Sequence, residues 1–134
     1  MLLVPLVWAE TASVAIHSLA GVRVLLVEDQ GIIALQIEDV LRKAGCEVVG
    51  PVARMQAAIS LAHDAALDAA VLDINLDGEN TYPVAEELQR RNIPFVLATG
   101  YGDSAVPERW KSLPRLSKPF LDEQLERLIR RLCC

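Results

Sequence analysis

The chain has 134 residues, of which 52% are hydrophobic, and its formal net charge at pH 7 is -5. This length predicts one domain with a single buried core, without room for a second catalytic or DNA-binding domain. The acidic balance argues against non-specific binding to nucleic acid. The three cysteines fit neither a disulfide framework nor a zinc site, which favours a reducing, cytoplasmic setting: Cys46, Cys133 and Cys134.

Residues 1–20 form an apolar extension before the regular part of the chain. No basic residue precedes its apolar run, Pro5 interrupts the run and Glu10 ends it, so we expect neither export nor a membrane anchor. The extension is expected to be helical or disordered. A helix that forms a homodimer is the alternative, because apolar residues recur on one helical face: Trp8, Ala12, Ala15, Ile16 and Leu19.

From residue 21 to residue 134, apolar runs alternate with segments of helical spacing. Pro107 and Pro114 limit any helix between them to a turn or two. The alternation predicts an α/β domain whose parallel sheet is covered by helices on both faces. The runs expected as strands are 22–27, 46–52 (ended by Gly50 and Pro51), 67–73, 93–100 and 115–117, and the expected helices lie near 33–44, 53–66, 82–92 and 121–132.

Polar residues follow four of these strands, and the carboxyl ends of parallel strands are where functional groups gather. Glu28 and Asp29 follow the first strand, and Asp73 ends the third. Three close carboxylates repel one another unless a cation lies among them, and an open oxygen-rich site suits Mg²⁺. A carboxylate beside the metal can form an acyl phosphate, with the Lys118 ammonium and the Thr99 hydroxyl contacting the phosphoryl oxygens.

Four motifs in order resemble the receiver domain of two-component response regulators: "LLVEDQ", "AVLDINL", "ATG" and "SKPF". The resemblance runs from residue 22 to residue 132. It implies a flavodoxin-like, doubly wound five-stranded parallel sheet with strand order 2-1-3-4-5. The resemblance also implies a cytoplasmic phosphoacceptor protein that is not an enzyme. Such a protein assists its own Mg²⁺-dependent phosphorylation and dephosphorylation.

The resemblance assigns a role to each matching residue. Asp73 is expected to be phosphorylated by a sensor histidine kinase, and Lys118 to contact the phosphoryl group after a cis peptide bond to Pro119. Thr99 is expected to act as the switch residue. The Mg²⁺ ligands are expected to be Asp29 directly, Glu28 through water, Asp73, and the main-chain carbonyl of Asn75.

Two departures from the usual receiver sequence indicate which subgroup of receivers this chain resembles. Arg115 stands where most receivers carry a strand-five aromatic residue, three positions before the lysine. The segment "PFVLATGYGD" is similar to a Phe-Ala-Thr-Gly-x-Tyr-like subgroup with a short or absent fourth helix, although Leu97 replaces the Phe. Tyr101 is then a second switch candidate, with an ordinary loop tyrosine as the alternative. Members of this subgroup work with kinases of the HWE or a related type.

Two rival sites are disfavoured by single positions. A calcium loop that starts at Asp73 requires a glutamate at its twelfth position, which is Val84. A haloacid-dehalogenase-type phosphatase requires an acid two residues after its nucleophile, which is Asn75. We therefore expect a single-domain response regulator that signals by contact with an unidentified output protein, without nucleic acid or membrane. A phosphate sink that competes for a kinase is the alternative, and a degenerate scaffold is disfavoured.

Overall fold

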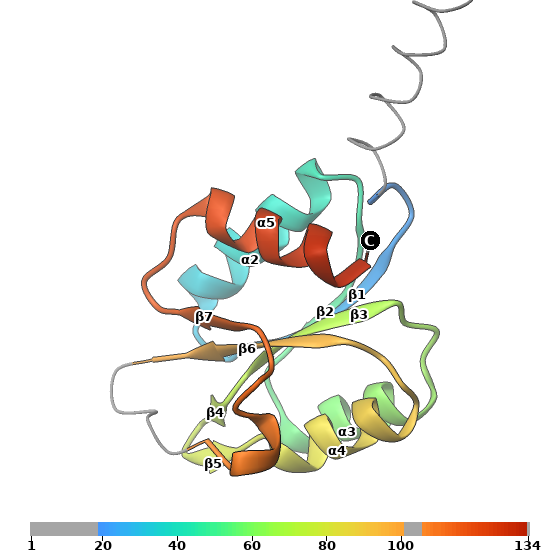
Figure 1. The fold of residues 1–134 in the computed structure, drawn as a ribbon, viewed down its shortest axis with the longest axis vertical. Coiled ribbons are helices and arrows are strands. Elements are labelled where there is room, and N and C mark those ends of the chain that lie inside the picture. The colour runs from blue at the N-terminus through green and yellow to red at the C-terminus, as the bar shows by residue number, and fades with distance from the viewer. Residues whose placement is uncertain (1–18, 101–105, 134) are drawn as a thin grey trace, which may run out of the picture.

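The computed structural model of the protein describes residues 19–100 and 106–133 (Figure 1). Tyr101 and the part of the extension before Leu19 lie outside these ranges, so what the sequence predicts for them stays a prediction. Leu19 itself is fully buried and packs against the domain. No helix within the described ranges is long and apolar enough to cross a membrane.

Five parallel strands form one sheet in the order β2-β1-β3-β6-β7, which confirms the predicted strand order. The central strand β3 is buried at all five of its residues, as expected for a continuous apolar run covered on both faces. The strands are β1 (Arg23–Val27), β2 (Glu47–Val52), β3 (Ala69–Asp73), β6 (Phe95–Thr99) and β7 (Arg115–Ser117).

Helices cover both faces of this sheet (Figure 1). The helices α2 (Gly31–Lys43) and α5 (Asp122–Cys133) lie on one face, and α3 (Met55–Asp64) and α4 (Tyr82–Arg90) lie on the other. Because side chains alternate along a strand, β1 contributes Leu26 to the α2 and α5 layer and Leu25 to the α3 and α4 layer. The core is therefore divided into two apolar clusters by the sheet.

Two segments differ in detail from the sequence prediction. The strand β2 does not end at Gly50 and Pro51, because its ladder with β1 resumes after a register shift and pairs Val52 with Val27. The loop after Asp73 contains a small antiparallel hairpin of β4 (Asn75–Leu76) and β5 (Glu79–Asn80). Its turn contains Gly78 at a φ of 87°, a backbone conformation that glycine adopts without a steric penalty.

Between β6 and β7, the described residues contain one 3₁₀ turn, η1 (Glu108–Trp110), in agreement with the short or absent fourth helix. Trp110 is fully buried and fixes this turn to α4, with its ring 4.9 Å from the ring of Tyr82. The Arg109 guanidinium lies 4.3 Å from the centre of the Trp110 ring and forms an ion pair with Glu86 of α4. The segment is thus held by one aromatic anchor instead of a full helix.

Candidate functional site

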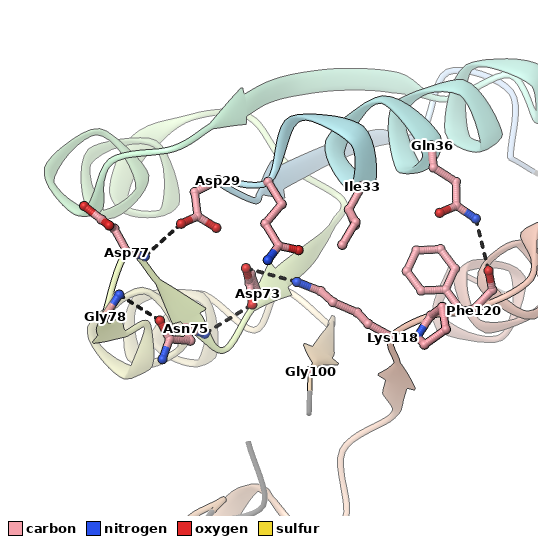
Figure 2. A pocket seen from close by; sticks show the side chains of 12 residues that line it. Asp29, Ile33, Gln36, Asp73, Asn75, Asp77, Gly78, Gly100, Lys118 and Phe120 are labelled. Atoms are coloured by element: carbon pink, nitrogen blue, oxygen red, sulfur yellow. Dashed lines mark hydrogen bonds and ion pairs between the residues drawn. The ribbon is translucent and has the colours of Figure 1, made fainter. Parts of the chain in front are cut away.

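Three carboxylates and one ammonium meet at the carboxyl edge of the sheet. Figure 2 shows Asp29, Asp73 and Lys118 among them. Glu28 and Asp29 follow β1, and Asp73 is the last residue of β3. One oxygen from each of these residues lies within 4.8 Å of the others. Lys118 follows β7, and its side chain reaches across the cleft to Asp73. The parallel register therefore brings together residues that are 90 positions apart in the sequence.

Lys118 contacts two of the three carboxylates. Its Nζ lies 2.8 Å from Oε1 of Glu28 and 3.2 Å from Oδ2 of Asp73. Burial alone lowers the pKa of a lysine, but these two carboxylates outweigh burial and raise the pKa of Lys118 above its usual value. The lysine is therefore a permanent positive charge in the site. The peptide bond between Lys118 and Pro119 is cis.

Asp73 is buried, with only 3% of the residue exposed. Its pKa is raised to about 7, first by burial and then by the neighbouring Glu28. The Lys118 ammonium and the backbone N–H of Asn75, which donates to Oδ1 of Asp73 over 3.2 Å, counteract this rise. Without a further cation this pKa favours the protonated carboxyl group below about pH 7, although a nucleophile must be ionised.

The β4–β5 hairpin orients the exposed part of the acidic cluster. The backbone N–H of Asp77 donates to Oδ2 of Asp29 over 2.9 Å. The backbone N–H of Gly78 donates to Oδ1 of Asn75 over 2.8 Å and closes the turn. The side chain of Asn75 thus bonds within the hairpin. The oxygen of Asn75 that the sequence analysis predicts as a metal ligand is a different one, its main-chain carbonyl.

Thr81 is a supporting residue that sequence reasoning missed. It is fully buried, and its hydroxyl donates a short hydrogen bond to the main-chain carbonyl of Asp73. Its backbone N–H donates to the carbonyl of Ile74 over 2.8 Å. The end of β3 is therefore held from behind by the residue that precedes α4. A threonine directly before a helix is a common capping signal, but the side chain does not cap this helix.

Gln36 of α2 is a second residue without a sequence signal. Its Nε2 donates to the carbonyl of Phe120 over 3.1 Å (Figure 2) and to Oδ1 of Asp122 over 2.9 Å. These two hydrogen bonds join α2 to the loop that follows Lys118 and to the first residue of α5. The sequence separation of more than 80 residues explains why no local pattern could predict the contact.

The site opens into a cleft of about 690 Å³. Asp29, Asp73, Asn75 and Asp77 lie toward one end of the cleft, whereas Ile33, Gln36 and Phe120 lie toward the other (Figure 2). Pro119 also lines the cleft. Among the predicted site residues that the structure describes, Glu28 and Thr99 do not belong to the cleft lining. Thr99 is half-buried, and its carbonyl accepts a 2.8 Å hydrogen bond from the N–H of Lys118.

The donor set fits a divalent, oxygen-preferring cation. Oε1 of Glu28 is buried, and among the described residues its ion-pair partner is the Lys118 ammonium. Burial, and then the neighbouring Glu28, raise the pKa of the Asp73 carboxyl, so negative charge there is disfavoured without a further cation. A cation of the Mg²⁺ type would compensate this charge through carboxylate and carbonyl oxygens.

Comparisons with known proteins agree with this geometry. Residues 24–130 match the family described as the response regulator receiver domain. SdrG from Sphingomonas melonis Fr1 is 39% identical, with a TM-score of 0.77 over 85% of this chain and 98% of that chain. The receiver domain of the sensor histidine kinase PA1611 from Pseudomonas aeruginosa PAO1, solved with a magnesium ion in its active site cleft, is 28% identical, with a TM-score of 0.73 over 85% and 98%.

Among curated relatives, the transcriptional regulatory protein PdtaR of Mycobacterium tuberculosis is 29% identical over 102 residues. The match covers 73% of this chain and 50% of PdtaR. The chain therefore spans about half the length of the curated relatives it matches.

Proposed function

Because this chain belongs to the response regulator receiver domain family of two-component systems, we propose that it accepts a phosphoryl group on Asp73 from a histidine kinase. We further propose that residues 21–134 form the receiver unit and that residues 1–20 are an extension that precedes it. The phosphorylated state is read by a partner protein through direct contact. The observation that carries this proposal is the placement of Lys118 between Glu28 and Asp73 at the head of an open cleft.

The transfer step follows from these residues. An ionised Oδ atom of Asp73 attacks the phosphorus of a phosphohistidine, a new O–P bond forms and the P–N bond breaks. The electron pair of that bond goes to the departing imidazole nitrogen. Lys118 stabilises the charge that spreads over the phosphoryl oxygens, because its ammonium is already held at the carboxylate. Because Asp73 lines the cleft, the new phosphoryl group extends into the cleft, where Lys118 lies.

Mg²⁺ is the proposed cofactor, held by Asp29, by Glu28 through water, by Asp73, and by the main-chain carbonyl of Asn75. When bound, it neutralises phosphoryl oxygens and the negative charge of the acidic cluster. The protein itself supplies the orientation of these ligands, through the hydrogen bond from Asp77 to Asp29 and the support of Asp73 by Thr81.

Two output roles are compatible with this chemistry. In the first, a partner recognises the phosphorylated domain. In the second, the domain is a phosphate sink that draws phosphoryl groups from a kinase shared with another regulator. A long-lived phospho-Asp73 favours the first role, and rapid hydrolysis without a phosphorylation-dependent partner favours the second. The resemblance in the segment around Thr99 suggests a kinase of the HWE type.

Phosphatase activity of the haloacid-dehalogenase type is a weaker candidate. That chemistry needs a carboxylic acid two residues after the nucleophile to protonate a leaving alcohol. Asn75 occupies this position, and its side-chain oxygen accepts a hydrogen bond from Gly78. The carboxamide has no proton of suitable acidity to donate.

The proposal is tested by incubating the protein with Mg²⁺ and phosphoramidate and recording its intact mass. We expect one phosphoryl adduct that disappears with EDTA and in Asp73→Asn. Asp77→Asn is the matched control, because Asp77 also lines the cleft but contributes its backbone N–H to the site. An adduct that persists in Asp73→Asn, or that is lost equally in Asp77→Asn, would overturn the assignment.

A further inference from the structure

An apolar groove lies at the amino edge of the sheet, the edge opposite to the phosphoacceptor cleft. It has a volume of about 600 Å³ and lies where β6 and β7 begin, beside the ends of α4 and α5. None of the described residues that line it is ionisable, although 23% of the whole chain is charged. An uncharged, largely apolar hollow in the surface is typical of an interaction site. The lining includes Ile93, Phe95, Leu113 and Leu132, together with two prolines and two amide side chains.

The chain enters the described structure beside this groove. Leu19, the first described residue, is fully buried in the core cluster under α2 and α5. Ala20 and Gly21 line a neighbouring pocket together with Leu132 and Cys133 of α5. Leu132 also lines the apolar groove, so the two hollows adjoin at this side chain. The residues that precede Leu19 therefore begin next to one wall of the groove.

The sequence of these preceding residues matches the apolar lining. Glu10 and His17 are the only ionisable side chains among residues 1–18. Leu19 belongs to a set of apolar residues with helical spacing, and its burial shows on which side the rest of this face would lie. The other members of the set are Trp8, Ala12, Ala15 and Ile16.

The distances along the sheet agree with this match. The strand β7 is three strand positions away from β1, which corresponds to about 14 Å. Trp8 precedes Leu19 by 11 positions, and a helix of that length spans about 16 Å. A helix that runs from Leu19 along the amino edge of the sheet would therefore bring Trp8 to the groove. Pockets of about 300–1,000 Å³ hold drug-sized molecules, so the groove has room for an indole ring.

We propose that residues 8–18 form a helix that docks on the amino edge of the sheet of the same chain and inserts Trp8 into this groove. The extension is thus an internal ligand of the domain. A second copy of the chain or a separate partner fits less well, because it has to compete with a tethered segment. The effective concentration of such a segment is in the millimolar range for a short linker.

The test uses the full chain with p-benzoylphenylalanine in place of Trp8. The protein is irradiated at about 1 μM, far below the effective concentration of a tethered segment, and the crosslink is located by peptide mass spectrometry. We expect crosslinks within one chain, to residues 92–95, 113–114 or 132. Crosslinks between two chains, crosslinks to other parts of the chain, or the absence of a crosslink would overturn the inference.

Leu132→Gln and Leu128→Gln are a matched pair of variants for this measurement. Both leucines belong to α5, both are half-buried and both pack against the same core cluster, but Leu128 does not line the groove. We expect Leu132→Gln to lower the crosslink yield at least about threefold, because the amide loses water when the extension docks. Leu128→Gln should leave the yield unchanged. Equal yields in the two variants would contradict docking in this groove.

A second pair of variants lies in the extension, so it leaves the core of the domain unaltered. Ile16 belongs to the proposed docking face, whereas Val14 is two positions away and therefore on the opposite side of a helix. Ile16→Gln should lower the crosslink yield and Val14→Gln should not; an equal effect of the two, or the reverse order, would count against the helix. Retained labelling of Asp73 by phosphoramidate verifies the fold of each variant. Docking requires no phosphoryl transfer, so this inference and the proposed function can fail separately.

Discussion

The ammonium nitrogen of Lys118 lies 2.8 Å from Oε1 of Glu28, and the two side chains are 11% and 0% exposed. The same nitrogen lies 3.2 Å from Asp73. Lysine therefore supplies the positive charge in the metal-free site, and a bound cation would compensate the same carboxylates. The same carboxylates are thus neutralised either by Lys118 or by a metal ion. This determines how the stability and the reactivity of the site depend on pH, on metal binding and on mutation.

The first prediction concerns pH. The pKa of Asp73 is raised to about 7 in the folded protein, against an ordinary value of 3.8. Between these values the folded state binds a proton that the unfolded state lacks, so the free energy of unfolding falls as pH rises across this window. We expect a loss of about 1–3 kcal/mol between pH 5 and pH 8, measured by urea unfolding in EDTA.

Asp73→Asn is the control for that measurement. The variant should be more stable than the unmodified protein at pH 8, because no charge is buried there, and should lose this part of the pH dependence. Mg²⁺ should restore stability to the unmodified protein at pH 8 and have a smaller effect on the variant. An unchanged pH dependence in Asp73→Asn would show that another group is responsible.

Lys118→Met should separate phosphoryl transfer from metal binding. Removal of the ammonium leaves the developing phosphoryl charge without one of its partners, so we expect labelling by phosphoramidate to slow by about 10- to 1000-fold. Mg²⁺ binding, followed by calorimetry, should persist because the carboxylates remain. Lys111→Met, at an exposed lysine of the η1 segment, should leave the labelling rate unchanged. A Lys118→Met protein that reacts at the normal rate would contradict the role of this residue.

Thr81→Val should destabilise the end of β3. The variant preserves the shape of the side chain but leaves the buried carbonyl of Asp73 without the hydroxyl donor, at an expected cost of about 1–3 kcal/mol in the free energy of unfolding. Thr81→Ser keeps the hydroxyl and should recover most of the loss. Urea unfolding checks both variants, and equal stability of Thr81→Val and Thr81→Ser would argue against the hydrogen bond.

Trp110 should report on activation. Lys118 and Thr99 are joined by a main-chain hydrogen bond, and the segment between them contains the Trp110 anchor on Tyr82. A phosphoryl mimic such as beryllofluoride with Mg²⁺ should draw Lys118 and Thr99 toward Asp73 and disturb this anchor. We expect a shift in tryptophan emission in a Trp8→Phe background, with altered hydrogen-exchange protection of residues 106–114. Unchanged emission and unchanged protection would place the response elsewhere.

The strands of the sheet, and the polar residues at their carboxyl ends, could be predicted from the sequence for a physical reason. Continuous apolar runs mark buried parallel strands, and the polar residues that end them must meet at one edge. The positions of Glu28, Asp29, Asp73 and Lys118 followed from this rule and from the resemblance. The η1 segment was also foreseen, because two prolines limit its length.

The supporting contacts could not be predicted in the same way. Gln36 and Thr81 act through hydrogen bonds to main-chain carbonyls, which depend on tertiary placement and leave no spacing pattern. The β4–β5 hairpin was read as a loop because two-residue strands are too short for an alternation signal. Thr99 has the expected position at the end of β6, but sequence alone gave no indication that it meets Lys118 through its carbonyl.

The most direct test of the central claim is chemical mapping of the phosphorylated residue. The protein is treated with Mg²⁺ and phosphoramidate, reduced with borohydride, which converts an aspartyl phosphate to homoserine, and digested for peptide mass spectrometry. We predict homoserine at position 73 alone, dependent on Mg²⁺. Homoserine at Asp29 or Asp77, or a stable phosphoryl group on another residue type, would contradict the assignment of Asp73 as the phosphoacceptor.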